Sequence, residues 1–215
     1  AQGDTWFRDP EVYAYVDRLV DEAFFEDFER VVFYGAGPCG YAAAAYSVAA
    51  PGASVIAVQP QATLDPDRAE WDDRFAEMRR TDFRSRYGYA PAMVEAAIEV
   101  FLIYDPHEQL DAMHAALFQG DNVIRLRLRN MGGAIQGDLI GMGVLEPLLA
   151  AAGDGVLDRE LFYEHLRARR DHMPYLRRLL ARAEEQGRLT LAWRVCRNVA
   201  GRLDARRFAL RMELL

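Results

Sequence analysis

The sequence contains no lysine, and all 26 of its basic residues are arginine. This absence excludes a Schiff-base lysine and the lysine of a phosphate-binding loop, so pyridoxal-phosphate chemistry and Walker-type nucleotide hydrolysis are both excluded. The sequence has only two cysteines, Cys39 and Cys196, which is too few for a disulfide framework. We expect both to be packed thiols.

Long apolar runs are also absent. No run approaches the ~18 to 20 residues that cross a bilayer, and no secretory signal pattern opens the chain. We therefore expect a cytoplasmic protein that does not associate with membranes. The chain begins with Ala1 and not with methionine, so we expect an amino-terminal part of the natural protein to precede it.

The two signs of charge are unevenly distributed. Residues 1–120 hold 9 arginines against 21 acidic residues, whereas residues 121–215 hold 17 arginines against 12 acidic residues. The acidic first part argues against nucleic-acid binding there. The arginine-rich tail is explained either by attraction to the acidic body or by a protein partner, and homo-oligomerisation stays open.

One complete strand, turn, helix and strand unit lies between residues 30 and 61. An apolar run over 30–34 ends at a glycine-rich turn over 35–40, and the alanine-rich run over 41–50 predicts a helix. Pro51 and Gly52 end that helix, and residues 54–58 predict a second strand. Two strands joined by a helix of about ten residues should lie parallel.

Further strands are predicted over 100–104 and 122–128, and we expect the second to be an edge strand because arginines alternate with apolar residues in it. From Asp138 onward the pattern is helical, with helices expected over 139–152, 158–172, 173–185 and 189–203. The predicted fold class is α/β: a mostly parallel sheet with flanking helices in a Rossmann-like three-layer arrangement, plus an α-helical carboxyl-terminal extension. We divide the chain into residues 1–149 and 150–215.

The glycine turn has two interpretations. In the first, Gly35, Gly37 and Gly40 form a dinucleotide fingerprint that lets a pyrophosphate approach the helix amino terminus. The strand that follows such a fingerprint normally ends in an acidic residue for the ribose hydroxyls, but here Val58 is followed by Gln59. An oxidoreductase that uses NAD(P) or FAD is therefore kept as an alternative.

The second interpretation comes from a resemblance. The segment Tyr34-Gly35-Ala36-Gly37-Pro38-Cys39-Gly40-Tyr41, with Gln59-Pro60-Gln61 after the next strand, resembles the nucleophile elbow region of bacterial α/β-hydrolase-fold proteins. In that family the turn reads Tyr-Gly-x-Ser-Met-Gly-Gly-Tyr, and the next strand ends in Ser-Pro-Gln or Asn-Pro-Gln. The similarity covers roughly residues 4–149 and implies an α/β-hydrolase-like fold for that part.

The resemblance also implies a catalytic triad that this chain has largely lost. Gly37 stands in the place of the serine, and no histidine occurs near Asn130 to Gly133, where the family has its base. Asp105 matches the acid and is therefore a vestigial one. Cys39, in the first helical turn, is an alternative nucleophile that would need His107 or His114 as its base.

We therefore expect a catalytically degenerate hydrolase-like protein that binds a small molecule or a protein partner, with no cofactor and no metal. The expected binding residues are Gly35, Ala36, Gly37, Pro38, Cys39, Gly40, Tyr41, Gln59, Gln61 and Asn130, with the loop over 81–89 beside them. If any activity survives, an esterase-type hydrolase comes first and an oxidoreductase second. A third alternative is a scaffold that binds its partner through the arginine-rich tail.

One further family is excluded. Sulfonucleotide (phosphoadenosine phosphosulfate) reductases carry a Ser-Gly-Gly-Lys-Asp-Ser-like phosphate loop and a cysteine near the carboxyl end. Here the turn over 35–40 has neither serine nor lysine, and Cys196 lies inside a predicted amphipathic helix.

Overall fold

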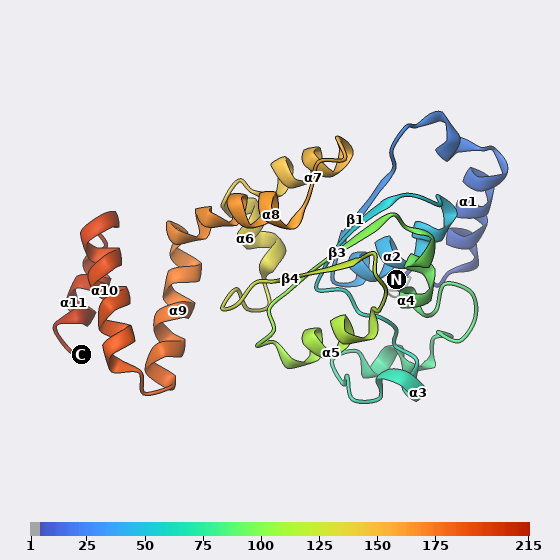
Figure 1. Cartoon of the computed structure of the whole chain (residues 1–215). Coiled ribbons are helices and arrows are strands. Elements are labelled where there is room, and N and C mark those ends of the chain that lie inside the picture. Colours follow the sequence, from blue (N-terminus) through green and yellow to red (C-terminus); the bar gives the residue numbers. More distant parts are fainter. Residues whose placement is uncertain (1–4) are drawn as a thin grey trace.

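The computed structural model describes residues 5–215 (Figure 1). The expectation about what precedes Ala1 lies outside these residues. The amino-terminal elements are α1 (Pro10–Asp21), η1 (Phe24–Asp27), β1 (Val32–Ala36), α2 (Pro38–Tyr46), η2 (Ser47–Ala49), β2 (Ser54–Val58), α3 (Pro66–Ala69), η3 (Ala76–Arg80), α4 (Ala90–Met93) and η4 (Val94–Ala96). They are followed by β3 (Glu99–Tyr104), α5 (Gln109–Leu117), β4 (Val123–Arg127), α6 (Ile135–Gly141), α7 (Leu145–Gly153), α8 (Arg159–His165), η5 (Leu166–Arg170), α9 (Met173–Glu185), α10 (Leu189–Leu203) and α11 (Arg206–Met212).

The four strands form one parallel sheet in the order β1-β2-β3-β4. In register, Val55 of β2 lies beside Phe33 of β1 and Val100 of β3. Every residue of β2 is buried, because a central parallel strand covered on both faces needs apolar side chains in both directions. Because the four strands are parallel, their carboxyl ends meet at one edge of the sheet, which is where ligand-binding sites lie in open α/β sheets.

Helices cover both faces of the sheet. One face packs Val55 and Leu102 against Tyr41 of α2, together with α1, α4 and the end of α5. The other face packs Phe101 and Ile103 against the residues of α6, α7 and α8. The predicted three-layer α/β arrangement with a helical carboxyl-terminal part is confirmed.

Strand β4 lies at the edge of the sheet, as its alternating arginines predicted. The Arg125 guanidinium donates to the carbonyl oxygens of Ala115 and Phe118, at the end of α5. Free carbonyl groups at a helix end attract a cation, so this arginine closes α5 against the sheet.

The single helix expected over 139–152 is wrong. Two helices, α6 and α7, occupy this stretch and are bent by 93° relative to each other. Gly143 has a φ of 67°, a conformation that favours glycine and ends α6. In residues 5–215 no single helix is long and apolar enough to cross a membrane; only the bent pair α6 and α7 reaches that length and composition together.

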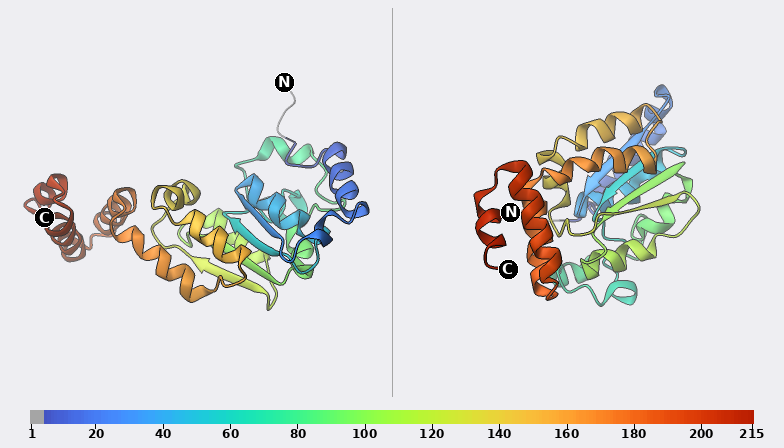
Figure 2. Two further views of the ribbon diagram at one scale, coloured as in Figure 1. Left: turned by 90° about the horizontal axis from the view of Figure 1, so that it is seen from above. Right: turned by 60° about the vertical axis from the view of Figure 1, so that its left-hand side comes forward.

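The last three helices extend away from the sheet, as the left view of Figure 2 also shows. They have an apolar core of their own, centred on Leu176, Cys196, Val199 and Phe208. The helices before them, through η5, pack on the sheet instead. The expected division between residues 149 and 150 falls inside α7, and it stays a prediction as a domain boundary.

Candidate functional site

The chain turns sharply at Gly37, between β1 and α2, where φ is 55° and ψ is −124°. A Cβ atom added at Gly37 would meet no atom within 4 Å, so the bend points toward open space. By contrast, a Cβ at Gly35 would lie 2.0 Å from the Cys39 carbonyl oxygen, and one at Gly40 would lie 3.1 Å from that of Val58. Gly35 and Gly40 are therefore needed for close packing, and Gly37 for the bend itself.

Pro38 follows the bend and opens α2. Proline is favourable at this position because its φ suits the first helical turn and its missing N–H has no partner there in any helix. In a nucleophile elbow, the N–H of the residue after the nucleophile forms part of the oxyanion hole. Because Pro38 has no N–H, this chain lacks that donor as well as the serine hydroxyl. The proline could have been recognised from the sequence, but our sequence analysis did not use it.

Asp105 lies at the end of β3 and is buried. One of its carboxylate oxygens, Oδ2, accepts a hydrogen bond from the Gly132 N–H at 2.8 Å. The other, Oδ1, accepts from the His107 N–H at 2.9 Å and lies 3.2 Å from His107 Nδ1. The backbone of the loop after β4 thus occupies the place where the resemblance puts a histidine.

A pocket of about 370 Å³ lies over the bend, at the carboxyl ends of the strands. Its lining comes from five segments of the chain: Ala36, Gly37 and Pro38; Gln59 and Gln61; Arg74 and Phe75; Glu108 and Asp111; and Gly133, Ala134, Gln136 and Gly137. The lining residues that were not predicted are Arg74, Phe75, Glu108, Asp111, Gly133, Ala134, Gln136 and Gly137, because no local pattern links segments this far apart in the sequence. A volume of this size holds a small ligand.

Two glutamines that were predicted together play different roles in this pocket. Gln59 has a φ of 49°, and both polar atoms of its side-chain amide are hydrogen-bonded. Nε2 donates to Asp111 Oδ2 at 2.7 Å, and Oε1 accepts from the Ile135 N–H at 3.1 Å. The side chain of Gln61 is buried, and its Oε1 has no hydrogen-bond partner in the part of the chain described. Since a buried unpaired acceptor is costly, Gln61 stands out in this pocket.

One wall of the pocket is an arginine held by two buried carboxylates. The Arg74 guanidinium contacts Asp72 at 2.8 Å and Asp111 at 2.6 Å. Burial alone would raise the pKa of Asp72, but hydrogen bonds from Arg74 and His114 outweigh it and lower that pKa. Arg74 is therefore held by two carboxylates and serves as a rigid wall.

His114 completes this network and is fully buried. Its Nδ1 accepts from the Ala62 N–H at 3.1 Å, so the proton of the neutral ring lies on Nε2, which is 2.8 Å from Asp72 Oδ2. Burial lowers the pKa of His114 more than the neighbouring carboxylate raises it. His114 therefore joins α5 to Ala62 and Asp72 as a neutral ring and has no exposed nitrogen for catalysis.

The loop over 81–89, which we expected beside the site, is held in place by hydrogen bonds from Arg8. This buried guanidinium donates to the Asp82 and Arg86 carbonyl oxygens at 2.9 and 2.6 Å, and to Ser85 Oγ at 2.9 Å. Tyr41 is also fully buried, and its hydroxyl donates to the Tyr87 carbonyl oxygen at 2.6 Å. Burial raises the pKa of Tyr41, so this hydroxyl stays a neutral anchor for the loop.

The remaining predicted residues lie outside the pocket. The Cys39 side chain is exposed on α2, so the expectation of a packed thiol is wrong for Cys39, whereas Cys196 is buried. Both histidines considered as a base for Cys39 are bonded elsewhere, His107 to Asp105 and His114 to Asp72. Asn130 offers its carbonyl oxygen to Arg178 at 3.3 Å. Within residues 5–215, no group of three or more histidine, cysteine or acidic residues could hold a metal ion.

Comparison of the chain with protein-family models, curated proteins and solved structures finds no match. The class that the structure defines is a three-layer α/β protein with a pocket at the carboxyl ends of its parallel strands. The resemblance to α/β-hydrolase-fold proteins lies in the sequence of residues 34–41 and 59–61.

Proposed function

We propose that this chain is a catalytically degenerate α/β-hydrolase-like protein that binds a small polar molecule in the pocket over Gly37. One observation carries the proposal: the bend that would present a nucleophile has a glycine at its apex and a proline after it, at the floor of a pocket of about 370 Å³. A strained turn between a strand and a helix is the backbone geometry of a nucleophile elbow. Gly37 supplies no nucleophilic hydroxyl, and Pro38 supplies no N–H to an oxyanion hole.

We infer the chemistry of the ligand from the unpaired Gln61 Oε1, which is buried in the wall of the pocket. A bound molecule with an N–H or O–H group would pair with this acceptor once the Gln61 side chain turns toward the pocket, and would so remove the cost of leaving it buried and unpaired. The carboxylate of Glu108 lies exposed at the rim and would favour a neutral or cationic ligand over an anion. We therefore propose small amides, alcohols or amines as the ligand class.

The oxidoreductase alternative has less support. A dinucleotide site in an open α/β sheet lies where the strand order reverses, but the four described strands run in sequential order. The Gln59 side chain, at the place of the ribose-binding acid, is already bonded at both ends. Saturable thermal stabilisation by NAD(H), NADP(H) or FAD would favour this alternative. The cytoplasmic location expected from the sequence stays a prediction.

The absence of hydrolase chemistry is tested with a fluorophosphonate probe and p-nitrophenyl acetate. We expect no labelling and no turnover above the uncatalysed rate, for the wild-type protein and also for Gly37→Ser, because residue 38 supplies no N–H donor. Labelling or turnover by the wild-type protein would overturn the proposal.

Binding is tested by two-dimensional amide NMR with acetamide, glycerol and ethanolamine as probes. We expect at least one probe to shift the Gln61 side-chain signal saturably. The variant Gly133→Trp should abolish this shift, because Gly133 lines the pocket and a Cβ atom added there meets no atom within 4 Å, so the indole has room to enter the pocket. Gly153→Trp is the matched control, since Gly153 is equally open but lies at the end of α7. Absence of any shift, or a shift that Gly133→Trp retains, would contradict binding at this pocket.

A further inference from the structure

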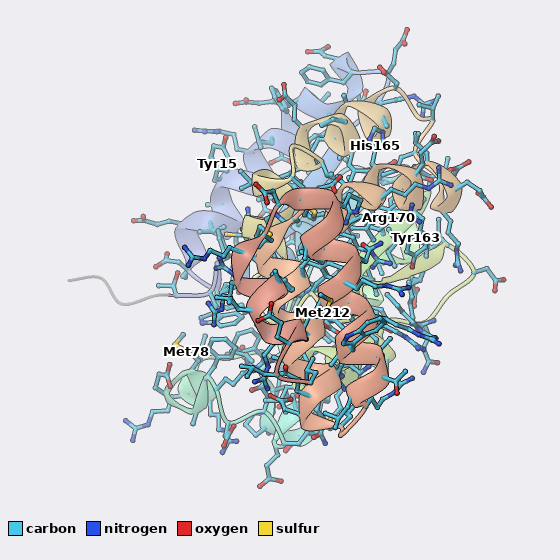
Figure 3. All side chains as sticks on the ribbon, turned by 90° about the vertical axis from the view of Figure 1, so that its left-hand side faces the viewer. Tyr15, Met78, Tyr163, His165, Arg170 and Met212 are labelled. Atoms are coloured by element: carbon cyan, nitrogen blue, oxygen red, sulfur yellow. The ribbon has the colours of Figure 1, made fainter. Side chains whose placement is uncertain are left out.

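The tail helices carry a second, larger concave site that the proposed function does not use. A groove of about 510 Å³ runs between α9 and α11. Its apolar lining includes Leu180, Phe208, Leu210 and Leu214. Leu210 and Leu214 are 51% and 75% exposed. Figure 3 views the molecule from this end, with Met212 labelled on α11.

Positive charge surrounds this groove. Arg177, Arg206, Arg207 and Arg211 line it, together with one acidic residue, Glu184. Arg211 pairs with Glu184 at 2.6 Å, whereas the other three arginines have no ion-pair partner in the described residues. Residues 173–215 as a whole hold ten arginines against four acidic residues. The groove therefore fits an occupant that has both apolar side chains and carboxylates.

A surface of this composition lies at the other end of the same chain. Residues 9–29 hold eight acidic residues and one arginine. At the end of α1 and along η1, five exposed carboxylates have no basic partner in the described residues: Asp21, Glu22, Glu26, Asp27 and Glu29. Phe24 and Phe28 stand among them, 44% and 51% exposed, with their ring centroids 5.3 Å apart. We call this the acidic aromatic surface.

These two surfaces cannot meet within one chain, because α1 and α11 lie at opposite ends of the molecule (Figure 1). In two chains that lie antiparallel, the groove of each would face the acidic aromatic surface of the other. A two-fold arrangement of this kind makes both contacts at once and closes without further growth. We propose that the arginine-lined groove binds the acidic aromatic surface of a second copy of this chain, which forms a reciprocal antiparallel dimer.

Nucleic acid is a less suitable occupant of the groove. A phosphate backbone would satisfy the arginines but would leave the exposed Leu210 and Leu214 without an apolar partner. Phe24 and Phe28 supply both kinds of contact when they arrive with their neighbouring carboxylates. The charge pairs would set partner choice and orientation, and the aromatic rings would supply most of the buried apolar area.

Charge reversal tests the dimer by sedimentation equilibrium on the full chain. Arg206→Glu with Arg207→Glu should weaken dimerisation at least about tenfold, because like charges then face each other across the contact. Asp21→Arg with Glu22→Arg should have the same effect. Both pairs of substitutions suit their helix ends, so the fold should be retained. Arg188→Glu with Arg194→Glu is the matched control, because it changes the charge equally outside the groove and should leave dimerisation unchanged.

Mixing the two reversed proteins gives the decisive result. One contact in the mixed pair joins two reversed surfaces and the other joins two wild-type surfaces, so both contacts are complementary and the dimer should return. A monomeric wild-type protein, or a mixture that stays monomeric, would overturn the proposal. So would a monomer that binds heparin or RNA in a manner lost on Arg206→Glu with Arg207→Glu, because the occupant would then be a polyanion.

Discussion

The buried carboxylate of Asp105 accepts a hydrogen bond from the backbone N–H of Gly132, 27 residues later in the chain. This bond joins the end of β3 to the loop after β4. The same carboxylate also receives the His107 N–H. A residue that the resemblance implies to be a vestigial acid therefore has a structural role that this geometry explains without reference to catalysis.

Replacement of Asp105 should therefore reduce stability. We expect Asp105→Ala to lower the free energy of unfolding by about 3 kcal/mol, because two backbone N–H groups lose their acceptor. Urea unfolding followed by circular dichroism measures this loss. Asp154→Ala, at an exposed helix end, should change stability by less than ~0.5 kcal/mol. Equal effects of the two substitutions would contradict a structural role for Asp105.

Alanine substitutions at two glycines should have opposite signs. Gly37 has a positive φ, so Gly37→Ala should cost about 1 to 3 kcal/mol although the added methyl group meets open space. Gly153 lies in helical backbone and is equally open, so Gly153→Ala should gain up to about 1 kcal/mol. Thermal unfolding of both variants compares them directly. A neutral Gly37→Ala would mean that the bend is not strained.

Leucine substitutions at Gln59 and Gln61 should have opposite effects on stability, and Gln61→Leu should abolish ligand binding. Gln59→Leu removes two hydrogen bonds and should destabilise the fold by about 2 to 4 kcal/mol. Gln61→Leu removes a buried unpaired acceptor and loses only one long hydrogen bond, from Nε2 to the Gln59 carbonyl oxygen at 3.5 Å, so we expect about 1 kcal/mol of stabilisation, or roughly 2 to 4 °C in Tm. The same variant should no longer bind acetamide or glycerol. Destabilisation by Gln61→Leu would indicate that Gln61 has a structural role.

Acid should weaken the fold through His114. Its pKa in the folded protein is lowered by burial, so the unfolded chain takes up a proton first as the pH falls below about 6.5. The lowered pKa of Asp72 adds stability that is present above about pH 3.9 and is lost as the pH falls through its folded pKa. The urea concentration at the unfolding midpoint should therefore decrease as the pH is lowered below about 6.5.

The variant His114→Gln tests whether His114 causes this dependence of the urea midpoint on pH. It should be less stable at neutral pH, because the Ala62 N–H loses its acceptor, and its midpoint should depend less on pH between about 6.5 and 4.5. His165→Gln serves as the control, since His165 lies at the end of α8 outside this network, and it should retain the wild-type profile. A wild-type slope in His114→Gln would exclude His114 as its origin.

Loss of the Arg8 anchor should loosen the loop over 81–89. Arg8→Met keeps the apolar stem but removes the hydrogen bonds to the backbone of the loop, so trypsin should cleave at Arg84 and Arg86 about tenfold faster. Arg18→Met, on the exposed face of α1, is the control and should leave the cleavage rate unchanged. Cleavage of both variants at the wild-type rate would show that Arg8 does not order this loop.

Local patterns in the sequence were sufficient for the sheet. The apolar run of β2 and the glycine turn before α2 predict a parallel pair because strand and helix periodicity depend on neighbouring residues. The alternation around Arg125 likewise predicted an edge strand, and the order of the strands confirmed it. The break at Gly143 was missed, because a glycine inside a helical pattern is either tolerated or a helix end, and only the packing of α6 and α7 decides between them.

The pocket needed the tertiary structure. Gln59 and Gln61 are two positions apart and alike in type, yet one is bonded to Asp111 and Ile135, whereas the other has a free acceptor. The sequence by itself determined the glycine bend, the absence of serine from the turn over 35–40 and the proline without an N–H donor, because these are properties of single residues and their neighbours. Only the tertiary structure decided which polar groups were already paired, because hydrogen bonds between distant segments depend on how the chain packs.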